Sequence, residues 1–550
     1  MPEGMAAAGK HPGQAAALDA GEADFVVIGA GAAGCVLANR LTASGRHSVR
    51  LLEAGGPDRH PWIKVPAGFS RTIHNKSLNW GYVTAASAGT AERAIPFPRG
   101  RVVGGSSSIN GHLYVRGQAA DYDLWAQRGC RGWSWEEVLP YFRRAETRPG
   151  GDPALRGHDG PLSVTDQADP HPLTTAFLEA ATRLGLPRNP DYNSGNQEGC
   201  FLYQQLLRGG RRWSAADAYL RPALRRPELQ MTTRALVEGI AFEGRRATGV
   251  FYRRGDTRFL VRARRQVVLA AGAINSPHLL QLSGIGDPDW LMPLGIPVRQ
   301  AMPEVGRNLR DHYAARIAVR LRGAASLNER AHGLRLMREV LRYAISRRGI
   351  LATSPAHGGA FLRTRPELAY PDLQLLFAPA SYSTLRFGAG LLEREPGMTC
   401  GAAQLRPESH GHVRALSTDP AALPEIQPNY LADPMDQATL LAGLRFVRTL
   451  FRTEPLAAVV DHETFPGASM PDEALLDHAR RTGATVYHPV GTCRMGSDPG
   501  AVVDPSLRVP GFEGLRICDA SVMPTMVSGN TYAATVMIAE KASDILLAGT

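Results

Sequence analysis

Three glycines near the start of the chain have the spacing that binds a dinucleotide phosphate. Gly29, Gly31 and Gly34 form a G-x-G-x-x-G after the apolar run at 24–28, which predicts a buried parallel strand. The first glycine permits a tight turn, the second a close approach of the backbone to a pyrophosphate, and the third close helix–strand packing. The N–H groups and dipole of the helix expected to continue from Cys35 would hold the negative charge.

An acidic residue, Glu53, ends the strand–helix–strand unit that contains these glycines. A second strand is predicted at 48–53 and ends in Glu53, beyond the helix that follows the glycines. A carboxylate in that place accepts the ribose hydroxyls of a dinucleotide and disfavours a 2′-phosphate. The sequence therefore predicts an FAD or NAD site rather than an NADP site.

A second cluster of small residues stands at 104–108, Gly-Gly-Ser-Ser-Ser, and continues through Asn110 to His112. Two glycines allow close backbone approach, and the serines add small hydrogen-bond donors. This composition suits a flat ring system with polar edges. Taken alone, it also fits an ordinary turn.

With these motifs in place, the chain resembles the glucose–methanol–choline (GMC) family of FAD-dependent oxidoreductases. Four blocks carry the resemblance, at 24–56, 100–142, 272–286 and 487–541. Because the blocks are spread along the chain in order, the resemblance spans residues 24 to about 546, nearly the whole chain.

The resemblance implies an FAD site. It places the isoalloxazine near residues 103–113, the adenine near the backbone of Val237, and the ribityl and pyrophosphate groups beside Asp519 and Ala520. Some family members link FAD through a histidine, but Ile109 occupies the matching position, and a hydrocarbon cannot form that bond. Non-covalent FAD is therefore expected, and no metal site is assigned. The expected cofactor-binding residues are Gly29, Gly31, Gly34, Glu53, Ala54, Arg101, Val103, Gly105, Ser106, Asn110, Gly111, His112, Leu113, Val237, Tyr487, Asp519, Ala520, Asn530, Thr531 and Tyr532.

The resemblance also implies two catalytic residues. His488, in the block Tyr-His-Pro-Val-Gly-Thr, matches the family histidine that faces the flavin, and its ordinary pKa of about 6.5 suits acid–base work. Asn530 matches a second position that holds His or Asn, and it would hydrogen-bond the substrate oxygen. His312, in the block at 308–312, receives a structural interpretation.

The expected substrate pocket includes His357, Leu405 and Tyr532. Tyr532 stands where the family commonly has Asn, which leaves the pocket's size open. Choline-oxidising members carry an acid near the segment 349–362, where this chain has none, so choline is not the expected substrate.

The function expected from the resemblance is oxidation of a primary alcohol to an aldehyde. A hydride passes to flavin N5 with His488 as acid/base, and the electrons then pass to oxygen or a quinone-type carrier. The alternative is a redox-inactive flavin-containing lyase of the same family, of the hydroxynitrile lyase type. A light-driven decarboxylase is disfavoured, because Leu405 precedes the Arg-Pro pair where those members have cysteine.

The composition of the chain bears on whether it binds nucleic acid or a membrane, and on its compartment. The 550-residue chain carries a net charge of +11, but its basic residues are nearly all arginine and are scattered, unlike those of a nucleic-acid binder. It has no uncharged apolar run long enough to span a membrane, which leaves open a peripheral membrane contact. Six cysteines without a C-x-x-C pair and an N-terminus without a signal pattern favour a cytoplasmic protein.

The strands and helices that must position these residues indicate an α/β fold for the dinucleotide-binding part. The whole chain is expected to be α+β. We expect a Rossmann-like FAD-binding domain with an inserted substrate domain built on an antiparallel sheet. The FAD-binding domain is predicted at 23–160, 225–315 and 481–550, the substrate-binding domain at 161–224 and 316–480, and a disordered tail at 1–22.

Overall fold

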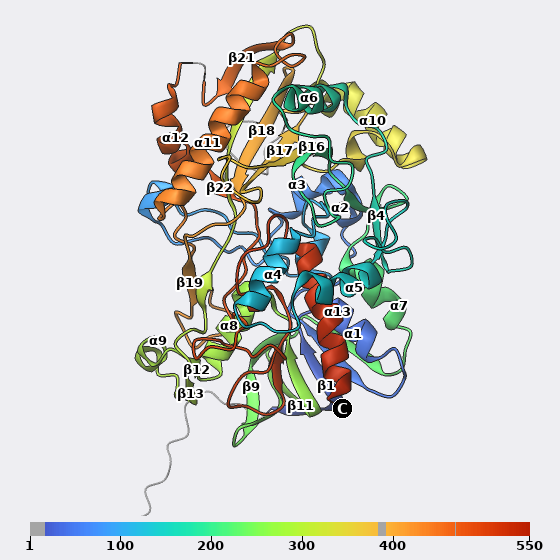
Figure 1. Ribbon diagram of the computed structural model, residues 1–550. Coiled ribbons are helices and arrows are strands. Elements are labelled where there is room, and N and C mark those ends of the chain that lie inside the picture. Colours follow the sequence, from blue (N-terminus) through green and yellow to red (C-terminus); the bar gives the residue numbers. More distant parts are fainter. Residues whose placement is uncertain (1–16, 383–391, 468, 550) are drawn as a thin grey trace, which may run out of the picture.

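The computed structural model describes residues 17–382, 392–467 and 469–549. Two seven-stranded sheets organise this part of the chain. The first occupies the lower part of Figure 1 and the second the upper part. The predicted combination of a Rossmann-like unit and an antiparallel sheet is confirmed.

The first sheet has a parallel core with an antiparallel extension. Strands β1, β2, β8, β11 and β23 run parallel to their neighbours, while β9 and β10 continue from β11 as antiparallel strands. Phe25, Val26 and Val27 are fully buried, as a strand covered on both faces requires. The strands are β1 (Leu18–Ile28), β2 (Val49–Glu53), β8 (Leu229–Thr233), β9 (Leu236–Glu243), β10 (Arg246–Arg254), β11 (Thr257–Leu269) and β23 (Leu515–Ile517).

The predicted disordered tail is wrong for its last residues. Residues 18–22 form the start of β1, where Leu18 pairs with Phe259 of β11. The unusually long β11 provides the pairing partner, and Asp19 forms an ion pair with Arg262 at 3.0 Å. A polar composition therefore did not prevent strand formation once a free sheet edge was available. Residues 1–16 of that prediction lie outside the described residues.

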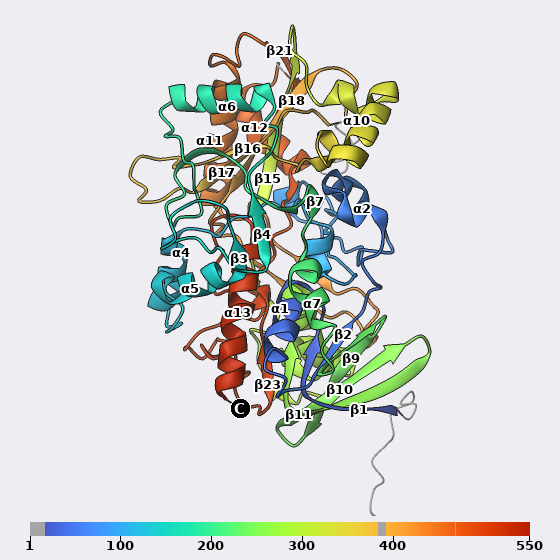
Figure 2. The same ribbon diagram turned by 90° about the vertical axis from the view of Figure 1, so that its right-hand side faces the viewer.

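Helices α1 (Ala32–Leu41) and α13 (Tyr532–Ala548) pack side by side against the first sheet (Figure 2). The buried carboxylate of Glu540 on α13 joins them through an ion pair to Arg40 at 2.8 Å. Helix α1 follows the end of β1 directly, so its N-terminus lies at the carboxyl end of the parallel strands.

The second sheet is antiparallel throughout, in the order β21-β15-β18-β17-β16-β5, with β22 beside β15. One face packs against helices α6 and α11 in a core of aliphatic and aromatic side chains. The strands are β5 (Gly199–Leu202), β15 (Tyr313–Leu321), β16 (Gly358–Leu362), β17 (Leu373–Ala378), β18 (Gly397–Gln404), β21 (Val460–Phe465) and β22 (Ala484–Thr485).

Two strands of this sheet extend beyond the predicted boundaries of the substrate-binding domain at 316 and 480. β15 begins three residues before 316, and β22, which pairs with it, follows 480. The division into two domains otherwise stays a prediction.

The remaining strands are β3 (Glu146–Thr147), β4 (Leu162–Thr165), β6 (Gln205–Arg208), β7 (Arg211–Arg212), β12 (Ile285–Gly286), β13 (Gln300–Ala301), β14 (Arg307–Leu309), β19 (Gly411–Arg414) and β20 (Glu425–Gln427). The remaining α-helices are α2 (Pro61–Lys64), α3 (Phe69–Thr72), α4 (Ala119–Gln127), α5 (Trp135–Ala145), α6 (Pro172–Arg183), α7 (Arg221–Ala223), α8 (Gly272–Leu282), α9 (Pro288–Leu291), α10 (Gly333–Ser346), α11 (Pro434–Phe451) and α12 (Leu475–Thr482).

Candidate active site

A cavity of about 410 Å³ lies where the two sheets approach each other. Its first wall comes from the residues at the carboxyl ends of β1, β2 and β11, the usual ligand-binding edge of a parallel sheet. Its second wall comes from β15, β17 and β18 of the antiparallel sheet. A ligand in this cavity therefore touches both halves of the molecule.

The glycine turn after β1 forms a cradle with one open position. A Cβ on Gly34 would lie 1.8 Å from the carbonyl oxygen of Gly29, and a Cβ on Gly29 would lie 2.6 Å from that of Ala270. These two glycines are required by backbone packing. A Cβ on Gly31, in contrast, would meet no protein atom within 4 Å, and Gly31 lines the cavity. Its empty side is where a pyrophosphate would fit.

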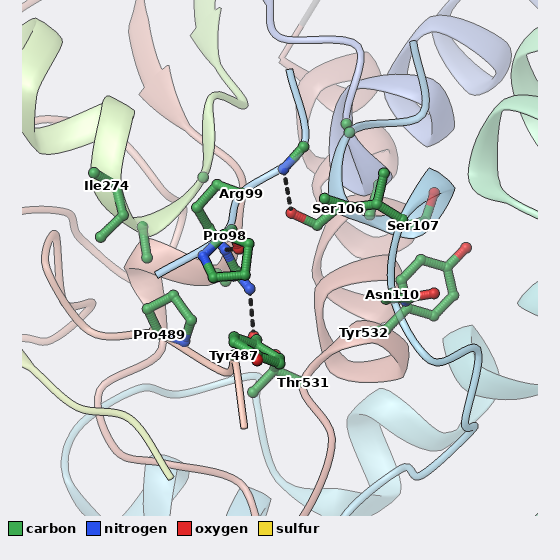
Figure 3. Close-up of a pocket in the computed structure, with 18 of the residues that line it drawn as sticks. Pro98, Arg99, Ser106, Ser107, Asn110, Ile274, Tyr487, Pro489, Thr531 and Tyr532 are labelled. Atoms are coloured by element: carbon green, nitrogen blue, oxygen red, sulfur yellow. Dashed lines mark hydrogen bonds between the residues drawn. The ribbon is translucent and has the colours of Figure 1, made fainter. Parts of the chain in front are cut away.

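The second glycine cluster touches the first. Gly105 has a φ of +54°, and a Cβ there would lie 2.7 Å from the Cα of Gly31. Ser106 accepts a hydrogen bond from the Gly100 N–H at 3.1 Å (Figure 3). The two motifs recognised separately in the sequence thus form one continuous wall.

Glu53 lies at the end of β2 and is buried on this wall. Its carboxylate accepts the N–H groups of Ala30 and Gly55, both at 2.8 Å. Burial raises the pKa of Glu53 to about 7, and these two donors oppose that rise. The carboxylate fixes the glycine turn and keeps lone pairs available for hydroxyl groups in the cavity.

Several buried polar atoms on the cavity wall have no hydrogen-bond partner within the described part of the chain. They include both ring nitrogens of His112, the Tyr532 hydroxyl and Oδ1 of Asn530. Native interiors rarely leave such groups unpaired. With the open cradle at Gly31, these atoms fit a large polar ligand such as FAD, which offers hydrogen-bonding groups along its length.

His488 and Asn530 line this cavity next to each other. Nδ2 of Asn530 lies 2.9 Å from Nε2 of His488. On its other side, Nδ1 of His488 lies 3.0 Å from Nδ1 of His312, and Nε2 of His312 lies 2.9 Å from the Leu405 carbonyl oxygen. Four residues from distant parts of the chain therefore form one hydrogen-bonded row.

The row fixes which nitrogen carries each proton. A carbonyl oxygen only accepts, so Nε2 of His312 carries the proton and donates to Leu405. Burial lowers the pKa of His312 to about 4, so the ring is neutral and its Nδ1 accepts. His488 then donates from Nδ1 and keeps a lone pair on Nε2, where the Asn530 amide donates. Burial, with smaller contributions from His312 and Arg99, also holds the pKa of His488 well below 6.5.

The backbone around His488 is clamped as well. Asp311 accepts the His488 N–H at 2.7 Å and the His312 N–H at 2.9 Å. Arg99 donates to the carbonyl oxygen of Tyr487 at 2.6 Å (Figure 3), and Tyr487 itself has a φ of +69°. A non-glycine residue in that region costs about 1–3 kcal/mol. The strained backbone at Tyr487 sets the direction of the His488 side chain.

Comparison with known proteins gives the family. The model of the N-terminal part of GMC oxidoreductases matches residues 23–314, and that of the C-terminal part matches residues 407–539. The chain belongs to the GMC oxidoreductase family. The family and its structural neighbours are FAD-dependent, which agrees with the cradle and the unpaired polar atoms.

Three similar proteins cover almost the whole of this GMC oxidoreductase. The alcohol dehydrogenase [acceptor] of Pseudomonas putida is 38% identical over 529 residues, 95% of each chain. The mitochondrial choline dehydrogenase of Homo sapiens is 42% identical over 535 residues, 96% of this chain and 90% of that one. The crystal structure of pyridoxine 4-oxidase from Mesorbium loti superposes with a TM-score of 0.86 at 33% identity, covering 95% and 98% of the two chains.

Most of the residues predicted for the site line the cavity of this GMC oxidoreductase. They are Gly29, Gly31, Glu53, Ala54, Gly105, Ser106, Asn110, Gly111, His112, Leu113, Val237, Tyr487, His488, Asp519, Ala520, Asn530, Thr531 and Tyr532.

Five predicted residues lie outside the cavity lining. Gly34 packs beneath the cradle, as described above. Arg101 stacks its guanidinium over the Trp80 ring at 4.7 Å, and Val103 is buried in the core of the first sheet. Leu405 points into an apolar cluster and contributes only its carbonyl to the row. The cavity lining next to His357 consists of Pro355 and Ala356, and the His357 ring is buried elsewhere.

Three residues outside the predicted site list lie at the site. His312, interpreted as structural, contacts His488 directly, and Asp311 clamps both histidines. Arg316 lines the cavity from β15. Strand alternation could have indicated Arg316. Residues two apart in a strand share a face, and Ala314 and Arg316 line the cavity together.

Within the described ranges, no helix combines the length and apolar character needed to cross a bilayer.

Proposed function

We propose that this protein oxidises a primary alcohol to an aldehyde with non-covalent FAD. The observation that carries the proposal is the His488–Asn530 pair, 2.9 Å apart, with the unprotonated Nε2 of His488 at the cavity. The names of the alcohol and choline dehydrogenases similar to this chain support the same class of reaction.

The residues that would hold FAD follow from the cavity wall. The turn at Gly29 and Gly31 and the start of α1 would bind the pyrophosphate, and Glu53 would accept ribose hydroxyls. The segment 105–113 would face the ring system, and the N-terminus of α13 would add positive potential there. When bound, FAD supplies a hydride acceptor. Ile109 on this wall offers no atom for a covalent bond.

The chain's own residues would handle the proton. With substrate bound, the Asn530 amide would donate to the substrate oxygen instead of to Nε2 of His488, and the freed lone pair of Nε2 would take the hydroxyl proton. His312 would accept from Nδ1 of His488 before and after the transfer, so that the ring does not rotate. Asp311 would hold the backbone of both histidines throughout. The electrons then pass to oxygen or to a quinone-type carrier.

The second wall limits the substrate. Arg316 is 5% exposed and lines the cavity beside Thr399 and Gly401. The acids on the described lining, Glu53 and Asp519, both lie on the first wall, where backbone N–H groups already bind them. The segment 349–362 likewise carries no acid that could bind a quaternary ammonium ion. The substrate we propose is therefore a primary alcohol without a quaternary ammonium group, rather than choline.

Anaerobic titration tests this function. Purified holoenzyme is mixed with neutral primary alcohols, with hydroxy acids and with choline, and the visible flavin band is recorded before air is admitted. Bleaching by neutral or acidic alcohols, but not by choline, is the expected result, and the rate of recovery in air reports oxygen as acceptor. Cleavage of a cyanohydrin with no bleaching by any alcohol would replace this proposal with the lyase function. Bleaching by choline alone would overturn the substrate class.

A further inference from the structure

Helix α10 exposes an apolar stripe to solvent. Leu334, Met337, Leu341 and Ile345 are 82%, 66%, 60% and 77% exposed. They recur every three or four residues, so they lie on one face of the helix. Large apolar side chains this exposed are usually scattered singly on a monomer, and a contiguous stripe marks an interaction site.

The opposite face of α10 attaches the helix to the protein through polar groups and through Leu336, which packs against Leu327 and Ile350. The buried carboxylate of Glu339 pairs with Arg330 and accepts the Ile350 N–H at 3.1 Å. The buried Tyr343 donates its hydroxyl proton to the Gly210 carbonyl at 3.1 Å. An ordinary surface helix turns its apolar face inward. Here the apolar stripe contributes little to folding, so the fold alone does not explain it.

Arginines border the stripe. At 100° per residue, Arg335, Arg338 and Arg342 lie together along one flank of α10, between the apolar stripe and the buried face. Arg347 and Arg348 follow the helix directly. The one acid within α10 is Glu339, which is buried and paired. Arg342 pairs with Asp169 at 3.2 Å, so Arg335 and Arg338, with Arg347 and Arg348 after the helix, supply the positive charge beside the apolar stripe.

We propose that α10 is a membrane contact that lies flat on an anionic phospholipid surface. The stripe would enter the boundary between headgroups and acyl chains, and the arginines would reach lipid phosphates. Charge selects this occupant over a second copy of the chain, since a symmetric pairing of α10 would bring its arginines close to their own copies. The helix lies at the outer edge of the molecule in both views (Figures 1 and 2), where a flat surface can reach it.

The contact would also bring the cavity close to lipid. Pro355 and Ala356, which line the cavity, follow α10 by fewer than a dozen residues. A membrane-dissolved alcohol or quinone would then approach from the side of α10. The membrane contact itself does not depend on the proposed oxidation.

Vesicle flotation tests the contact. The holoenzyme is mixed with vesicles of phosphatidylcholine alone, or of equal parts phosphatidylcholine and phosphatidylglycerol. We expect flotation with the anionic vesicles, weakened in about 1 M salt, where the screening length falls to roughly 3 Å. The combined change Leu334→Gln, Leu341→Gln and Ile345→Gln should reduce binding by about tenfold or more. The matched control is Met292→Gln, since Met292 is 61% exposed on a different element and should bind as the unchanged protein does.

Three outcomes would overturn the proposal. One is absence of flotation with anionic vesicles, and another is equal loss in the triple variant and the Met292 control. The third is a dimer, seen by light scattering, that becomes a monomer in the triple variant, which would assign the stripe to a second copy. Flavin content and thermal unfolding check that each variant is folded. Flotation without alcohol-dependent bleaching would leave the membrane contact standing while the proposed oxidation fails.

Discussion

The glycine cradle and the hydrogen-bonded row are built by different means. The cradle is made of backbone, where glycines let main-chain atoms come closer than any side chain would permit, as at Gly34 and Gly105. The row is made of side chains, those of His312, His488 and Asn530. Backbone contacts admit no small adjustment, whereas a hydrogen bond in a row can weaken while its neighbours persist. Changes in the cradle should therefore abolish FAD binding, and changes in the row should give graded effects with FAD retained.

The largest effect should come from the cradle glycines, which form a matched pair. Gly34→Ala puts a Cβ 1.8 Å from the Gly29 carbonyl oxygen, so we expect loss of FAD and a fold destabilised by about 3 kcal/mol or more. Gly31→Ala meets no protein atom, so its apoprotein should unfold at the normal temperature while FAD binding fails. The flavin-to-protein absorbance ratio and thermal unfolding of the apoproteins separate the two. Normal FAD content in Gly31→Ala would place the pyrophosphate elsewhere.

Next in size is His488→Ala. Loss of a general base typically slows the chemical step by roughly 10²- to 10⁴-fold. Stopped-flow measurement of anaerobic flavin reduction gives the rate, and the absorbance ratio should show full FAD content, because His488 touches the row and not the cradle. A variant that reduces flavin at the normal rate would remove His488 from the mechanism.

A smaller effect should follow from His312, which positions His488. His312→Phe removes the acceptor for Nδ1 of His488, a bond that becomes charge-assisted once His488 takes the proton. Such bonds are worth about 1.5–3 kcal/mol, so flavin reduction should slow by roughly 10- to 100-fold. His312→Gln should recover part of this loss, because its amide oxygen accepts the same bond.

The control for that prediction is His357→Phe, another buried histidine, which lies off the cavity lining. It should leave the reduction rate within about twofold of normal. Equal losses in His312→Phe and His312→Gln, with no shift in the pH profile, would reduce His312 to a packing role.

The same contrast explains what could be predicted from the sequence. The cradle is contiguous, so Gly29, Gly31 and Gly34 report their own geometry through their spacing. The row joins residues far apart in the chain: His312 and His488 are separated by 176 positions. Their contact depends on how β15 meets the segment before His488, which spacing does not encode.

Two further differences between prediction and structure concern which residues face the cavity. His357 was expected in the pocket, but the cavity lining at this point consists of Pro355 and Ala356, because the chain turns before β16 begins. Arg316 was overlooked because the alternation of β15 assigns a face only once the neighbouring strand is known. The side of a strand that faces the substrate is therefore a property of the assembled sheet.

The smallest effect we expect is a change in rate that stays within twofold, and it tests whether His488 is neutral in the working enzyme. The base must be unprotonated, so activity falls as the pH drops through its pKa. An ordinary histidine pKa of about 6.5 would leave roughly a quarter of the base neutral at pH 6. Burial holds the pKa of His488 well below that value, so the acid limb moves to lower pH. We therefore expect kcat/KM with an uncharged alcohol to change less than about twofold between pH 8 and pH 6. A half-maximal fall near pH 6.5 would show that water reaches His488 in the working enzyme and that the row does not hold the ring neutral.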